Sequence, residues 1–296
     1  MTSRVMRDFD LLLPGNLPDA LDLLATHQDN SAIMAGGTDL LVALKFDYKI
    51  DNVISLAFVP DLDHLTFDPE EGLTIGAKVT IADILKSETV KTHYPALWQA
   101  AESFATPQLR NVATVVGNLL RASPAGDCSL AIYAIGGKIK LQSKGGTRVI
   151  DLDDFWLSYG VTACRDDELA IEIKIPAPAM GATCAFRRMT RTHEDLSKIG
   201  AAVSLQMKGE HCMAARVAMG CVGPTLIRLP LTENALTGAD VTDDLLAEIS
   251  QNVTREISPI DDQRSTADYR RKVAGVLVRR VIEMALRDGK CKGNTP

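Results

Sequence analysis

The sequence has no concentration of positive charge. It carries 32 lysine and arginine residues against 38 aspartate and glutamate residues, which gives a formal net charge of −6, and it contains no basic run. A protein that binds the phosphate backbone of DNA or RNA needs a basic surface. We therefore expect no nucleic-acid partner.

Long hydrophobic runs are also missing. The apolar run Leu11–Leu13 ends at Pro14, and nowhere do about 18 apolar residues, the length that a membrane-spanning helix needs, follow one another. We expect a cytoplasmic protein without a membrane span or a secretory leader. The length of 296 residues exceeds a typical domain of ~100–150 residues and favours two domains.

Residues that bind metals or act as nucleophiles are scattered. No two cysteines have the spacing of zinc or iron–sulfur ligands, the five histidines form no HExxH motif, and no Gly-x-Ser-x-Gly elbow is present. We therefore predict no metal site and no catalytic residue in this chain. The cysteines, which we expect to be reduced and buried, are Cys128, Cys164, Cys184, Cys212, Cys221 and Cys291.

Periodicity and capping residues predict mixed helices and strands in the first part of the chain. Asn16 is suited to cap a helix that takes Pro18 in its first turn, and Thr80 is suited to cap another. The other predicted elements are helices at 39–45 and 95–104, buried strands at 31–34, 53–56 and 73–76, and short strands between 132 and 175.

The pattern changes after the segment Ala177–Ala179, which is the best candidate for a domain boundary. Strands then precede helices, and this order predicts an α+β domain. The predicted elements are strands at 201–207 and 213–222, helices at 242–257 and 265–288, and a frayed tail at 289–296.

Two charged groups near the C-terminus are expected to face solvent. The adjacent carboxylates Asp261 and Asp262 are typical of turns or of helix N-termini. On the last predicted helix, the apolar residues gather on one side, and the arginines should mostly face away from it. These arginines are Arg270, Arg271, Arg279 and Arg280.

Two segments rich in small and hydroxylated residues are candidate ligand sites. In Ile33–Leu40 the pair Gly36-Gly37 allows backbone N–H groups to turn toward a ligand, an arrangement that suits a pyrophosphate. The second segment runs from Thr114 to Asn118 and is followed by Ser123–Asp127. From these residues alone, a tight glycine turn and a self-satisfied polar loop remain open, and more common, interpretations.

At these segments the sequence resembles the FAD-binding, or medium, subunits of molybdenum hydroxylases of the xanthine dehydrogenase, aerobic carbon monoxide dehydrogenase and nicotinate dehydrogenase type. The resemblance covers nearly the whole chain. It rests on Ala35–Leu40, Pro107–Thr114, Gly117-Asn118, Ala122–Asp127, Tyr269–Arg271 and Val276–Arg280.

The resemblance implies an α+β architecture with two parts. A two-lobed FAD-binding domain of the PCMH/VAO type would span residues 1–177, with subdomains at about 1–56 and 57–177. An α+β C-terminal domain, with an antiparallel sheet and helices, would span 178–296.

The resemblance also implies the residues that bind FAD. Residues 33–40 would wrap the pyrophosphate, Phe104 would lie near the adenine, and residues 114–118 would form a second loop beside phosphate and flavin. Arg187 would keep a positive charge, and Leu196 would lie in the segment that flanks the isoalloxazine ring. The full expected set is Ile33, Met34, Ala35, Gly36, Gly37, Thr38, Asp39, Leu40, Phe104, Thr114, Val115, Val116, Gly117, Asn118, Ser123, Asp127, Arg187 and Leu196.

Three positions depart from the family pattern. Val116 stands where glycine is common, and a β-branched residue resists a positive φ. Arg121 replaces a small or amide residue, and Leu196 replaces a tyrosine that one branch places against the flavin. We expect Val116 to alter the loop conformation or the flavin contact, and Arg121 and Leu196 to alter the redox potential and the oxygen reactivity of the flavin.

Electrons would therefore reach FAD from partner subunits and leave for an external acceptor. The implied partners are a large subunit with the molybdenum cofactor and a small subunit with two [2Fe-2S] clusters, assembled as a dimer of heterotrimers. Two alternatives stay open at this point: a self-sufficient FAD-dependent oxidoreductase and a non-catalytic nucleotide-binding scaffold subunit.

Overall fold

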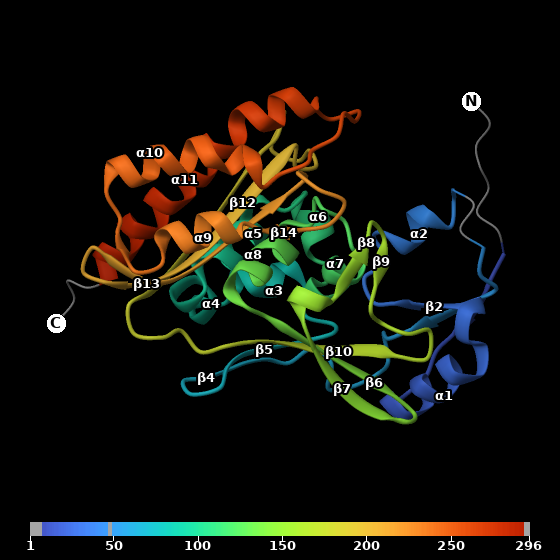
Figure 1. Ribbon diagram of the computed structural model, residues 1–296. Helices are drawn as coiled ribbons and strands as arrows, with labels where there is room; N and C mark the ends of the chain where they lie inside the picture. Colours follow the sequence, from blue (N-terminus) through green and yellow to red (C-terminus); the bar gives the residue numbers. More distant parts are fainter. Residues whose placement is uncertain (1–7, 47–48, 293–296) are drawn as a thin grey trace.

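The N-terminal lobe is built on a small parallel sheet. A computed structural model describes residues 8–46 and 49–292 of the chain (Figure 1). In this lobe the strand order is β1-β3-β2, and Leu21 and Leu24 of the first helix pack against Ile54 of the central strand. The elements are β1 (Asp10–Leu12), α1 (Leu17–His27), β2 (Ser31–Met34), α2 (Leu40–Ala43) and β3 (Asn52–Ser55).

The second lobe carries a five-stranded antiparallel sheet of order β4-β5-β10-β6-β7. Six helices pack with it around the largest hydrophobic core, in which Ile75, Leu119 and Ile173 are fully buried. The elements are β4 (Leu65–Asp68), β5 (Gly72–Gly76), α3 (Ile81–Lys86), α4 (Glu88–His93), α5 (Pro95–Ser103), α6 (Pro107–Arg110), α7 (Val115–Leu120), α8 (Asp127–Ile135), β6 (Lys138–Ser143), β7 (Gly146–Asp151), the hairpin β8 (Trp156–Ser158) and β9 (Val161–Thr162), and β10 (Leu169–Ile175).

The C-terminal part is an antiparallel sheet of order β11-β12-β13-β14, with β15 added to β13. Three helices cover one face of this sheet (Figure 1). The α+β class predicted from the sequence is thereby confirmed. The elements are β11 (Ala182–Met189), β12 (Ile199–Lys208), β13 (His211–Gly220), β14 (Ile227–Arg228), α9 (Pro230–Leu236), β15 (Ala239–Asp240), α10 (Asp243–Asn252) and α11 (Ala267–Lys292).

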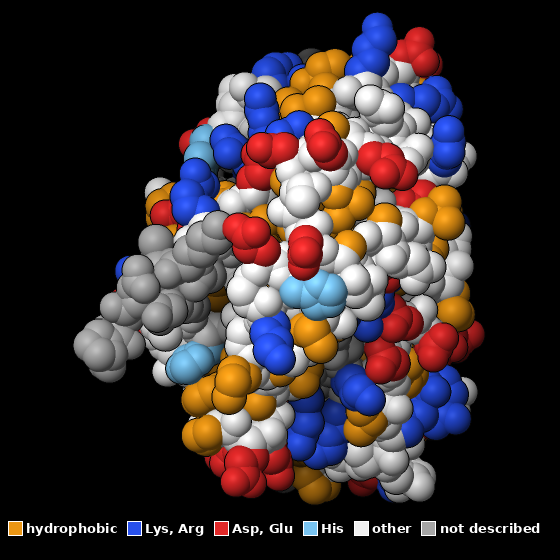
Figure 2. Space-filling model, turned by 60° about the vertical axis from the view of Figure 1, so that its left-hand side comes forward, with side chains coloured by type: hydrophobic (Ala, Val, Ile, Leu, Met, Phe, Trp, Pro, Cys, Tyr) orange, Lys and Arg blue, Asp and Glu red, His pale blue; other side chains and the backbone are white. Residues whose placement is uncertain are grey.

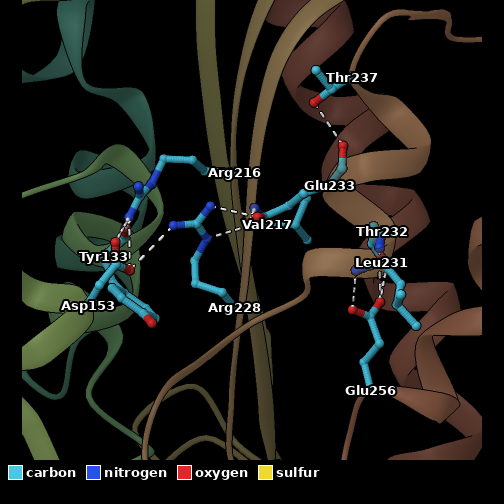
Figure 3. Close-up of polar contacts among 10 residues, drawn as sticks. All are labelled: Tyr133, Asp153, Arg216, Val217, Arg228, Leu231, Thr232, Glu233, Thr237 and Glu256. Atoms are coloured by element: carbon cyan, nitrogen blue, oxygen red, sulfur yellow. Dashed lines mark hydrogen bonds and ion pairs between the residues drawn. The ribbon is translucent and has the colours of Figure 1, made fainter.

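The two parts meet along the other face of the C-terminal sheet. Helix α5 packs against β11, and α8 packs against β12 and β13. A charged cluster reinforces this junction: Arg216 and Arg228 both contact the Asp153 carboxylate, at 3.2 and 3.4 Å, and Arg228 also pairs with Glu233 (Figure 3). The cluster joins the β7–β8 region to the C-terminal sheet.

The capping predictions for the two helices are confirmed. The Asn16 side chain accepts a hydrogen bond from the Asp19 N–H at 2.8 Å. Thr80 and Asp83 form a reciprocal capping box, and Pro95 opens α5 as predicted. Local side-chain chemistry therefore explains where these helices begin.

Several predicted elements were wrong in type or length. Residues 127–135 are helical, although short strands were predicted from residue 132, and the helix predicted at 39–45 covers only Leu40–Ala43. The last helix runs to Lys292, into the predicted tail. Arg270, predicted to face away from the apolar side, is 2% exposed and lies inside the C-terminal part. At residues 127–135 and at Arg270, tertiary burial overrides the local pattern.

The surface carries charges of both signs. The face drawn in Figure 2, which brings the left-hand side of Figure 1 forward, shows acidic and basic side chains intermixed. Within residues 8–46 and 49–292, no helix is long and apolar enough to cross a membrane. The five described cysteines are free thiols, and four of them are buried, whereas Cys291 lies among residues whose side chains are not described.

Candidate functional site

A cleft of about 590 Å³ lies between the N-terminal lobe and the second lobe. Three parts of the chain form its walls: the β2–α2 connection, the segment 113–121, and the segment 160–170. The cleft brings together twelve of the residues predicted to bind FAD. They are Ile33, Ala35, Gly36, Gly37, Thr38, Asp39, Leu40, Phe104, Thr114, Val116, Gly117 and Asn118.

The glycine pair shapes one wall through two different requirements. A Cβ on Gly36 would lie 1.8 Å from the carbonyl oxygen of Val112, so only glycine lets the loop pass beside that backbone. Gly37 has a φ of +69°, which disfavours other residues. Together they press the β2–α2 connection against the segment that leads into α7. This contact brings the two predicted ligand segments together.

Several backbone N–H groups of the β2–α2 connection lack an acceptor among the described residues. Within the described residues, the N–H groups of Gly36, Gly37 and Thr38 donate to no protein acceptor. Buried or half-buried N–H groups normally find a partner. Because these groups line an open cleft, they are available to an anionic ligand.

The opposite wall is helical rather than a loop. The Thr114 side chain caps α7 by accepting a hydrogen bond from the Gly117 N–H at 3.1 Å. Val116 lies within this helix and is buried, so the position makes no demand for a positive φ. A β-branched residue is therefore accommodated at this position without a positive φ, and a difference in flavin contact from the family stays a prediction. Asn118 braces the wall by accepting hydrogen bonds from the Ser129 N–H and hydroxyl.

The third wall was not predicted. Glu168, whose side chain is 1% exposed, pairs with Arg148 at 2.6 Å and with Arg165 at 2.9 Å. Beside it, burial raises the pKa of the Cys164 thiol to about 12, which keeps the sulfur protonated and unreactive. Nothing in the local sequence pattern connects this segment to the glycine loop, which lies more than a hundred positions earlier in the chain.

Six of the predicted residues do not line the cleft. Val115 belongs to the core, and Met34 packs against the small hydrophobic cluster that contains Leu44 in the N-terminal lobe. The Ser123 hydroxyl accepts a hydrogen bond from the Ala125 N–H. The others, Asp127, Arg187 and Leu196, lie toward the C-terminal part, where Arg187 and Leu196 are exposed and Asp127 is buried.

Asp127 joins the FAD-binding half to the C-terminal half. Its carboxylate accepts hydrogen bonds from Arg188 at 2.7 Å and from the Ser197 hydroxyl at 2.6 Å. Arg188 also donates to the carbonyl oxygens of Ser103 and His193. Arg188, whose side chain is 7% exposed, takes part in this junction, whereas its neighbour Arg187, which was expected to keep a positive charge near FAD, is exposed. Successive residues of a strand point to opposite faces, so only the strand's position in the fold decides between them.

Burial raises the pKa of Asp127 to about 6, despite the opposing attraction of Arg188 and the hydrogen bond from Ser197. This carboxyl group touches no wall of the cleft. We therefore assign it to the junction rather than to chemistry on a ligand.

The cleft has the features of a dinucleotide site. It lies between two lobes, is lined by Phe104, and is bordered by a glycine loop whose N–H groups have no acceptor within the described residues. Within the described residues, no group of His, Cys, Asp and Glu side chains is arranged to hold a metal ion. These features define the class: a protein that binds a nucleotide-containing cofactor.

Matches to two family models identify the cofactor and the family. Residues 7–178 match the model described as FAD binding domain in molybdopterin dehydrogenase, and residues 184–285 match the CO dehydrogenase flavoprotein C-terminal domain. The chain therefore belongs to the family of FAD-binding subunits of molybdenum hydroxylases, and it is a flavoprotein subunit of an oxidoreductase.

Individual relatives match along almost the whole chain. The caffeine dehydrogenase subunit beta of Pseudomonas sp. (strain CBB1) is 31% identical over 94% of this chain and 94% of its own length. The carbon monoxide dehydrogenase medium chain of Hydrogenophaga pseudoflava is 28% identical over 94% of this chain and 96% of its own. The solved structure of carbon monoxide dehydrogenase from the same organism superimposes with a TM-score of 0.92 at 27% identity, covering 96% and 99% of the two chains.

Proposed function

We propose that this chain binds FAD in the cleft between the two lobes and passes electrons from partner iron–sulfur clusters to an external acceptor. The observation that carries this proposal is the glycine loop, which lines a cleft of about 590 Å³ and whose N–H groups donate to no acceptor within the described residues. When bound, FAD supplies the redox chemistry. The protein's own residues bind the cofactor and shield it from water.

We assign the cofactor contacts to the cleft residues named above. Gly36, Gly37 and Thr38 would donate backbone hydrogen bonds to the pyrophosphate. Phe104 would pack against the adenine. For Asp127, Arg187 and Leu196 a direct contact with FAD stays a prediction, because none of them lines the cleft.

The partners and domain limits belong to the same proposal. Relatives are named as medium chains or subunits of larger complexes, and homologous complexes carry molybdenum-pyranopterin and iron–sulfur cofactors in other subunits. This supports a large molybdenum subunit and a small subunit with two [2Fe-2S] clusters, assembled as a dimer of heterotrimers. The family matches at 7–178 and 184–285 support a division into residues 1–177, with lobes 1–56 and 57–177, and residues 178–296.

The substrate of the complex lies outside this chain. The relatives are named for caffeine, carbon monoxide and 6-hydroxypseudooxynicotine, although the matching subunits resemble this chain almost equally. The described residues also offer no metal site for the substrate chemistry. The terminal acceptor and a cytoplasmic location stay predictions.

The test is a titration of the purified chain with FAD, in which flavin fluorescence measures binding. Gly36→Ala should weaken FAD binding at least ~100-fold, because its methyl group would strike the Val112 carbonyl and displace the loop. Gly15→Ala is the matched control, since its Cβ would meet nothing within 4 Å. A thermal melt of each variant checks the fold. A Gly36→Ala variant that folds and retains full FAD affinity would contradict the assignment.

A further inference from the structure

Arg121, one of the departures from the family pattern, connects the two walls of the cleft. It follows the last turn of α7, and its Nε lies 3.4 Å from the Asp39 carboxylate, directly after the glycine loop. Its guanidinium carbon also lies 5.7 Å from the centre of the Tyr159 ring in the β8–β9 hairpin. One side chain therefore contacts all three segments that meet at this end of the cleft.

The position of Asp39 gives this contact an electrostatic consequence. Asp39 lines the cleft immediately beyond the N–H groups of Gly37 and Thr38. An unpaired carboxylate at this place would repel an anion bound by those N–H groups. Arg121 neutralises Asp39 and adds a guanidinium whose planar donors match phosphate oxygens.

Arg165, the other arginine among the described cleft residues, cannot serve as this phosphate donor. Arg165 pairs with the buried Glu168 at 2.9 Å and with Asp167 at 3.5 Å, so its charge is already matched. The Arg121–Asp39 pair, at 3.4 Å, is longer than the Arg165–Glu168 pair, and its carboxylate is 64% exposed whereas that of Glu168 is 1% exposed. An exposed pair of this kind is weak and exchanges partners readily.

We infer that Arg121 is a pyrophosphate-binding residue of this chain. It offsets the charge of Asp39, and it donates to a phosphate oxygen when a dinucleotide occupies the cleft. Tyr159 holds the guanidinium over the cleft through a cation–π contact. The inference rests on the proposed function and deepens it, because it assigns a side-chain contact to the phosphate end of the cofactor.

The experiment compares three ligands on the full chain by titration calorimetry. FAD and ADP contain a pyrophosphate, whereas riboflavin contains the ring system without it. Arg121→Gln should weaken FAD and ADP binding about 10-fold to 100-fold, the range of one hydrogen bond to a charged group. Riboflavin binding should be unchanged, and Arg121→Lys should retain part of the ADP affinity.

Two further variants sharpen the result. Adding Asp39→Asn to Arg121→Gln should recover part of the lost ADP affinity, because the carboxylate that Arg121 offsets is then gone. Arg279→Gln removes the same charge from an exposed ion pair on α11, outside the cleft, and it should change ADP affinity less than ~3-fold. The ADP affinity of the wild type should also fall more steeply with salt than that of Arg121→Gln.

The outcomes separate this inference from the proposed function. Equal losses for riboflavin and ADP, or no loss for ADP, would overturn the role of Arg121 while leaving the FAD site in place. A wild-type chain that binds neither FAD nor ADP would overturn the proposed function itself, and the inference with it. Loss confined to FAD and ADP supports both.

Discussion

Two aspartate–arginine pairs in this chain have nearly the same geometry but opposite electrostatics. Asp127 lies 2.7 Å from Arg188 at the junction, and Asp262 lies 2.8 Å from Arg270 within the C-terminal part. Burial raises the pKa of Asp127 to about 6. Burial acts on Asp262 in the same direction, but hydrogen bonds from Arg270 and from the backbone of Arg264 and Ser265 lower its pKa well below the ordinary value.

The number of donors and the remaining solvent exposure explain the difference. Asp127 is 5% exposed and has only two side-chain donors, Arg188 and Ser197. The Asp262 side chain is 24% exposed, and two backbone N–H groups of its own turn add to two arginines. A nearby cation alone therefore does not decide the charge state of a buried carboxyl group.

The largest expected effect comes from breaking the Asp262 pair. Arg270→Met removes a buried guanidinium that also donates to the carbonyl oxygens of Lys198 and Ile260. We expect a loss of about 3–5 kcal/mol in the free energy of unfolding, the usual result of removing one partner of a buried pair. Urea unfolding followed by circular dichroism measures it.

Arg271→Met is the control for this variant, because Arg271 is half-exposed and pairs only with the exposed Asp268. Its effect should stay within about 0.5 kcal/mol. A loss below ~1 kcal/mol for Arg270→Met would show that the Asp262 pair does not anchor the C-terminal part.

A smaller and pH-dependent loss is expected at the junction. Arg188→Met leaves Asp127 buried without its cation, and the carboxyl group then takes up a proton instead of staying charged. We expect about 2–4 kcal/mol of destabilisation at pH 8 and less at pH 5. The exposed neighbour Arg187→Met should change stability by no more than about 0.5 kcal/mol at either pH. Equal effects of the two substitutions on stability would contradict a stabilising role of Arg188 at the junction.

The smallest expected effect is a change of stability with pH, which should differ in sign between Asp127 and Asp262. Because the pKa of Asp127 is raised from 3.8 to about 6, its contribution to stability is fully present below pH 4 and is lost as pH rises through 6. The stability of the wild type relative to Asp127→Asn should therefore fall, by on the order of 2–3 kcal/mol, between pH 4 and pH 7.

Asp262 should show the opposite slope. Its lowered pKa contributes stability that is present above the ordinary value of 3.8 and lost as pH falls below it. Asp262→Asn should therefore cost most near neutral pH and progressively less in acid. Parallel pH profiles for the two asparagine variants would contradict the comparison between the pairs.

Much of the fold could be predicted because its signals are local. Asn16 and Thr80 cap helices through side chains that act within three residues, and the alternation of Ile171, Ile173 and Ile175 marks the buried face of β10. The helix α8 was missed, since eight of its nine residues are buried and it therefore lacks the amphipathic period that reveals a surface helix.

The cleft was predicted only in part for a similar reason. The loop at Gly36-Gly37 and the segment from Thr114 can be recognised by their composition. Arg165 and Glu168, by contrast, lie at the cleft because the chain returns there before it enters β10. Their ion pair carries no signal in sequence spacing. Long-range contacts of this kind depend on how the lobes pack.

In the sequence by itself, the resemblance of several short motifs indicated the family, the expected cofactor and the two ligand segments. Capping residues and hydrophobic periods indicated many of the helices and strands, because these signals act over a few residues. Only the tertiary structure decided that Arg188 rather than Arg187 is buried, that Arg270 faces inward, and that Arg121 meets Asp39. Adjacent side chains on a strand point to opposite faces, and charges far apart in sequence become neighbours only after the sheets and helices have packed.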